Sequence, residues 1–125
     1  MNIKVLFWVQ GILLIILGFW GMIDGEGALS GFGLETTSET LTLNRGFSLS
    51  QIVLGVIAFR LPSWVGNKLK EPAIIGGLIN TAFLINIFYD LNSDAISGSG
   101  ATINLILTIV FAALFFIFGA RHKNN

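Results

Sequence analysis

Four long apolar stretches, separated by short polar segments, divide the chain. They cover residues 3–23, 40–61, 72–91 and 101–120. A helix of about 20 mostly apolar residues spans the hydrocarbon core of a bilayer. The pattern therefore predicts an all-α integral membrane protein, in which one domain over residues 1–125 forms a four-helix bundle.

Capping residues and prolines set the expected ends of these helices. A capping-box pattern predicts that the second helix begins near Thr37. Proline disfavours helical backbone at the preceding residue, so this helix should end just before Pro62. Pro72 suits the first turn of the third helix, where backbone N–H groups have no helical partner. The glycine-rich segments 24–34 and 92–100 are expected to be loops.

The second stretch carries a single stripe of polar and small residues among large apolar side chains. At helical spacing the stripe consists of Asn44, Ser48, Gln51, Gly55 and Ala58. A helix that is apolar on its other sides turns such an edge toward protein. We expect the stripe to form hydrogen bonds at its Asn44 end and to pack backbone to backbone at its Gly55 end.

Each long stretch also carries an amide side chain, and counting along the helices places these amides in two layers. Gln51, Asn86 and Asn104 should lie at one depth, and Gln10 and Asn80 at another. Hydrogen bonding between helices is the favoured interpretation, and a polar pocket open to the outside is the alternative. The candidate residues for either role are Asn44, Arg45, Ser48, Gln51, Asn86, Asp90, Asn104 and Thr108.

Small residues on the first helix predict where it packs. Gly11, Gly18 and Gly25 recur at heptad spacing on one face, and small residues permit close helix contacts in lipid. Packing within the chain is the favoured interpretation. Gly21 and Gln10 mark a second face that could contact another copy of the chain.

Composition agrees with a membrane protein and limits the chemistry. The chain is 54% hydrophobic and only 11% charged, against about 25% charged in soluble domains. It has no cysteine and a single histidine, His122, so disulfides and thiolate metal sites are excluded. We predict no catalytic residue, metal or cofactor. The interior of each stretch lacks carboxylates, which argues against a proton-coupled pump.

The charges predict an orientation. In a four-span arrangement, one side of the membrane receives six basic residues and the other side receives only Arg45. Basic residues are retained on the cytoplasmic side, so both termini should be cytoplasmic in a multi-pass protein of the cell membrane. The six basic residues are Lys4, Arg60, Lys68, Lys70, Arg121 and Lys123.

Arg45 is the single basic residue on the acidic side. It could anchor the helix at the membrane interface, with its charged head reaching water. Alternatively it could pair with Glu35, Glu39, Asp24 or Asp90 and close an outer mouth that binds an anionic group. The second arrangement would suit an enzyme or carrier for a lipid-like molecule.

Three short motifs resemble those of small four-helix bacterial membrane-protein families of unknown function. They are Phe32–Leu34 in the outer loop, and Arg45–Phe47 and Gln51–Gly55 on the second helix. The resemblance implies the architecture and a bacterial inner membrane, and it implies no particular activity.

Three functions follow from these patterns. A non-enzymatic structural, assembly or accessory module is favoured, because no catalytic motif is present. The alternatives are an oligomeric transporter or channel and a binder of a lipid-like ligand. Expected partners are membrane lipids, a second copy of the chain or another membrane protein. No nucleic acid is expected, because anionic lipid explains the basic residues near the termini.

Overall fold

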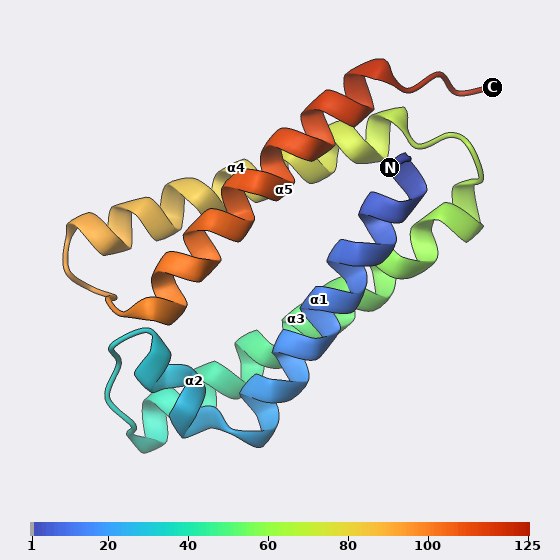
Figure 1. The fold of residues 1–125 in the computed structure, drawn as a ribbon. Coiled ribbons are helices and arrows are strands. Elements are labelled where there is room, and N and C mark those ends of the chain that lie inside the picture. The colour runs from blue at the N-terminus through green and yellow to red at the C-terminus, as the bar shows by residue number, and fades with distance from the viewer. Residues whose placement is uncertain (1) are drawn as a thin grey trace.

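The computed structural model describes residues 2–125, which form five helices and no strand (Figure 1). Four of the helices are long and apolar enough to cross a membrane. This confirms the expected all-α, membrane-type architecture. The helices are α1 (Ile3–Ile23), α2 (Gly25–Gly31), α3 (Ser38–Val65), α4 (Lys70–Asn92) and α5 (Ser99–Arg121).

The short helix α2 lies where a loop was expected, so that prediction is wrong. Asp24 caps α2, because its side chain accepts a 3.0 Å hydrogen bond from the backbone N–H of Gly27. Ala28 and Leu29 are buried. Glycine has low helix propensity, which hides this helix in the sequence pattern. Tertiary burial of its two apolar residues stabilises it instead.

The second long helix starts as expected but ends later. Thr37 is its N-cap and forms a reciprocal capping box with Thr40. The helix continues through Pro62 to Val65, so the prediction that it ends before the proline is wrong. Pro62 is buried and stands only one turn from the end, where it removes a single backbone hydrogen bond. Gly66 then closes the helix by donating to the Pro62 carbonyl oxygen at 3.0 Å.

The other two long helices begin two residues earlier than expected. α4 starts at Lys70, which leaves Pro72 within its first turn. α5 starts at Ser99. The sequence pattern therefore predicts both helices correctly, but it places each start two residues too late.

The long helices form two antiparallel pairs, the first of which is α1 with α3 (Figure 1). Its centre is a backbone contact: a Cβ atom added to Gly11 would lie 2.7 Å from the Gly55 carbonyl oxygen. Near the α2 end, Asn44 Nδ2 donates a 2.9 Å hydrogen bond to the Gly21 carbonyl oxygen. Ser48 is buried beside it. Asn44, Ser48 and Gly55 of the stripe thus pack against α1 as expected, whereas Gln51 and Ala58 line a cleft described below. Gly21 lies in this contact and not on a separate exposed face.

The second pair, α4 with α5, also packs through small residues. A Cβ atom at Gly77 would come within 2.9 Å of the Phe116 ring. A Cβ atom at Gly119 would lie 3.1 Å from the Cβ of Ala73. Gly77 on α4 thus leaves room for the Phe116 ring of α5, and Gly119 on α5 packs closely against Ala73 of α4. Small residues commonly allow such close contacts between helices in lipid.

The two pairs join at the end of the molecule that carries both termini and the α3–α4 loop (Figure 1). The rings of Phe7 and Phe115 meet edge to face, with centroids 4.9 Å apart. His122 Nε2 donates a 2.6 Å hydrogen bond to the Asn67 carbonyl oxygen, which ties the C-terminal segment to the loop. The buried core at this end consists of Ile3, Leu6, Phe7, Leu69, Ala73, Phe111 and Phe115.

A second junction lies at the opposite end, between α2 and the start of α5. The backbone N–H of Ser97 donates a 2.9 Å hydrogen bond to the Phe32 carbonyl oxygen. Gly100 approaches Gly31 so closely that a Cβ atom at Gly100 would lie 2.6 Å from the Gly31 carbonyl oxygen. The unexpected helix α2 therefore bridges the two pairs at this end.

Candidate functional site

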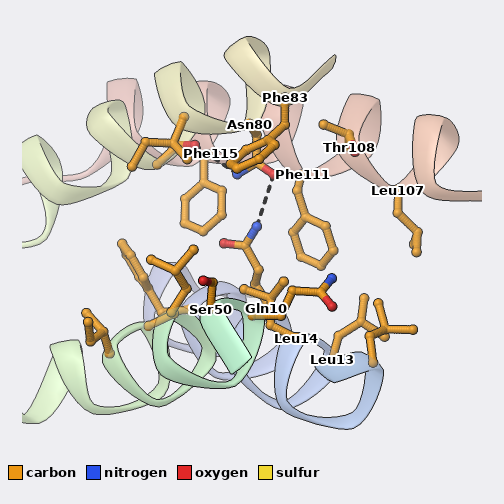
Figure 2. A pocket seen from close by; sticks show the side chains of 18 of the residues that line it. Gln10, Leu13, Leu14, Ser50, Asn80, Phe83, Leu107, Thr108, Phe111 and Phe115 are labelled. Carbon is orange, nitrogen blue, oxygen red and sulfur yellow. Dashed lines mark hydrogen bonds between the residues drawn. The ribbon is translucent and has the colours of Figure 1, made fainter. Parts of the chain in front are cut away.

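A cleft of about 560 Å³ lies between the two helix pairs, and none of the residues that line it is charged (Figure 2). All four long helices contribute to it. Large aliphatic and aromatic side chains form most of the lining. Its polar members are Gln10, Ser50, Gln51, Asn80, Asn104 and Thr108.

The cleft opens sideways between α3 and α4. α1 and α5 contact each other near the end with the termini, whereas α3 and α4 make no comparable contact within residues 2–125. Leu54 on α3 and Ile79 and Phe83 on α4 line the cleft and are exposed. The cleft therefore opens at the side of the molecule, between two helices, and not at either end of the helices.

One polar bridge crosses the cleft. Gln10 Nε2 donates a 3.0 Å hydrogen bond to Asn80 Oδ1 (Figure 2). Asn80 is buried, and its own amide nitrogen donates to the Gly76 carbonyl oxygen at 2.8 Å. The expected meeting of Gln10 and Asn80 is confirmed. Because the bridge joins α1 to α4, it links the two pairs where their backbones stay apart.

The other expected amide layer is present only in part. Gln51, Asn104 and Thr108 line the cleft, and Thr108 Oγ1 donates to the Asn104 carbonyl oxygen at 2.6 Å. Asn86 is exposed outside the cleft and contacts Asp90 Oδ2 at 3.5 Å. Its position six residues after Asn80 places it on a different face of α4, since a helix has 3.6 residues per turn. Counting residues estimates the position along a helix but does not predict the direction in which a side chain points.

The amides of Gln51 and Asn104 face open space in the cleft. Within residues 2–125 neither side chain has a hydrogen-bond partner, yet no enclosed side-chain polar atom there lacks one. Both amides are therefore accessible from the cleft. Each offers a donor and an acceptor to a bound molecule.

The remaining candidates lie away from the cleft. Asn44 and Ser48 belong to the α1–α3 contact. Arg45 is exposed, and its Nη2 donates to Thr42 Oγ1 at 3.3 Å on the same helix. In the described part of the chain it forms no ion pair with the carboxylates considered as its partners. The structure does not bring Arg45 and Asp90 together into a binding site.

Several residues of the cleft carry no signal in the sequence. Phe7, Leu54 and Phe111 read as ordinary core or lipid-facing positions, and only the spacing of the helix pairs turns them toward a common space. Ser50 lies beside the polar stripe but outside it. Its hydroxyl donates to the Gly46 carbonyl oxygen at 2.9 Å, which satisfies it within α3.

The arrangement is suited to holding a molecule and offers few groups for chemistry. Uncharged amides and hydroxyls orient a ligand by hydrogen bonds, whereas the apolar lining follows its shape. Residues 2–125 contain no group of three or more His, Asp or Glu side chains placed to hold a metal ion. In comparisons of the whole chain, no family model, no curated protein and no solved structure matches it.

Proposed function

We propose that this protein is a multi-pass membrane module that binds a lipid-like molecule in the cleft and catalyses no reaction. The observation that carries the proposal is the uncharged cleft open between α3 and α4. It is lined along α3 from Phe47 to Leu61, which covers roughly 20 Å at about 1.5 Å per residue. That length is most of a hydrocarbon core of about 30 Å.

The lining suits a long hydrocarbon chain that carries a hydrogen-bonding group. Ligand sites are mainly apolar with a few placed polar groups, and volumes of about 300–1,000 Å³ are typical. The accessible amides of Gln51 and Asn104 can bind a carbonyl or hydroxyl oxygen of such a molecule. A sideways opening lets the ligand enter from the bilayer without crossing water.

We further propose that the end with both termini faces the cytoplasm, in the plasma membrane of a bacterium. The basic residues gather at this end, which supports the orientation. Because the chain has no cysteine, single cysteines can report it. Ser93→Cys should react with a membrane-impermeant maleimide on intact cells, whereas Ser63→Cys should react only after lysis. The opposite labelling pattern would reverse the orientation.

Filling the cleft should remove ligand binding. The probe is a phosphatidylethanolamine with a diazirine on its acyl chain, added to vesicles that contain the purified protein. Ala58 lines the cleft on α3, so Ala58→Trp places a large ring inside it. Photolabelling of cleft residues should fall several-fold, as measured by peptide mass spectrometry.

The matched control is Ala113→Trp, because Ala113 is exposed on α5 outside the cleft. It should label like the unmodified protein. In the unmodified protein, label should concentrate on Ile57 and Ile79 and not on Ile109, which is exposed but does not line the cleft. Uniform labelling of all three positions would reject the proposal, even if Ala58→Trp proved unstable.

A further inference from the structure

A second, shallower hollow adjoins the cleft at the end with the termini. Pro72 and Ile75 of α4 line both spaces, so the hollow and the cleft share a wall. The α3–α4 connection forms another side. The residues that line the hollow are Trp64, Val65, Lys68, Glu71, Pro72, Ile75 and Asn124.

The hollow differs from the cleft because it carries charge of both signs. Lys68 lies in the α3–α4 loop and Glu71 in the first turn of α4, and both side chains are exposed. Within residues 2–125 they line the same space without forming an ion pair with each other. A cation and an anion are thus both free to bind a third group.

The remaining walls are an aromatic ring and the C-terminal segment. Trp64 is 58% exposed and borders the hollow. Asn124 is held in place because its Oδ1 accepts a 3.1 Å hydrogen bond from the backbone N–H of Lys70. His122 ties the same segment to Asn67. These two hydrogen bonds hold the C-terminal segment in place as one wall of the hollow.

We propose that this hollow binds the headgroup of an aminophospholipid of the phosphoethanolamine class, whose acyl chain lies in the cleft. This inference rests on the proposed function of the cleft. The Lys68 ammonium binds the phosphate by a charge-assisted hydrogen bond. The Glu71 carboxylate accepts hydrogen bonds from the ligand ammonium, and the Trp64 ring attracts the same cation.

The charges favour a zwitterionic headgroup over the other common classes. An anionic glycerol headgroup would gain from Lys68 but be repelled by Glu71. A quaternary ammonium has no N–H to donate to Glu71, so a phosphocholine headgroup loses that hydrogen bond. The position also fits, because Trp and Lys side chains concentrate where lipid headgroups begin.

Competition between lipids tests the headgroup. The diazirine-tagged phosphatidylethanolamine is again the probe, and unlabelled lipids compete for photolabelling of the cleft. Phosphatidylethanolamine should compete several-fold better than phosphatidylcholine or phosphatidylglycerol. Lys68→Glu should lower labelling by the probe several-fold. Glu71→Lys should shift the preference toward phosphatidylglycerol, because the hollow then carries two positive charges.

Lys70→Glu is the matched control, since it makes the same charge change next to the hollow at a residue that does not line it. It should leave probe labelling and lipid preference unchanged. Equal competition by all three lipids, or equal effects of Lys68→Glu and Lys70→Glu, would overturn the headgroup site. If Ala58→Trp still abolished cleft labelling, the proposed function would survive that result. If the three lipids competed equally and Ala58→Trp also left cleft labelling unchanged, both proposals would be overturned.

Discussion

Gly55→Leu is expected to push α1 away from α3 and to destabilise the protein strongly. A Cβ atom at Gly55 would lie 2.7 Å from the Gly11 carbonyl oxygen and 3.0 Å from the Ile15 backbone nitrogen. These neighbours are backbone atoms, so they cannot move aside as a flexible side chain would. Overpacking a core typically costs about 1–3 kcal/mol, and a leucine here must push two whole helices apart. Heating the protein in mild detergent, followed by size-exclusion chromatography, should show a much lower melting temperature.

Gly46→Leu is the control on the same helix. A Cβ atom at Gly46 meets nothing within 4 Å. Replacing a helical glycine that has free space removes conformational freedom from the unfolded chain, so a neutral or slightly stabilising effect is expected. Equal melting temperatures for the two variants would contradict the close backbone contact between Gly55 and Gly11.

Phe115→Ala is expected to give the second largest effect, by weakening the junction between the two pairs. Phe115 is 0% exposed and contacts the rings of Phe7 at 4.9 Å and Phe111 at 6.4 Å between centroids. Removing a buried phenylalanine side chain typically costs about 3–5 kcal/mol, because the cavity that it leaves does not fully collapse. Denaturant unfolding in mixed micelles, monitored by tryptophan fluorescence, would measure the loss.

Phe88→Ala removes the same number of atoms from a surface position. Phe88 is 61% exposed on α4, so its loss should change the free energy of unfolding little. A comparable destabilisation by the two variants would contradict the idea that the aromatic cluster joins the pairs.

The sequence predicts the four long apolar helices well because length and apolar character decide them. The contact between Gly11 and Gly55 was also within reach, since small residues at helical spacing define a face. The short helix α2 and the continuation past Pro62 were not, because tertiary packing overrides weak local preferences there. Asn86 shows another limit, since the depth of a residue does not determine the direction in which it points.

The cleft itself is the part that sequence patterns miss. Its walls are ordinary apolar positions, and it exists because the pairs contact each other mainly near their two ends. The distance between two packed pairs depends on side chains from all four helices at once. The amide pattern predicts that Gln10 and Asn80 lie together and offers a polar pocket at Gln51, Asn104 and Thr108 as an alternative, but it does not predict the apolar walls or the sideways opening of the cleft.

The way in which the pairs are joined determines where the molecule can deform most easily, which is between the pairs and not within them. Within each pair the helices contact through small residues, so sliding or spreading them requires backbone atoms to pass one another. Between the pairs, the middle is crossed by the Gln10–Asn80 hydrogen bond, and firm junctions lie near the two ends. The two pairs are thus joined firmly near their ends and by fewer contacts at their midpoints. We therefore expect a molecule bound in the cleft, as proposed above, to be accommodated by a small separation of these midpoints, while the packing inside each pair stays unchanged.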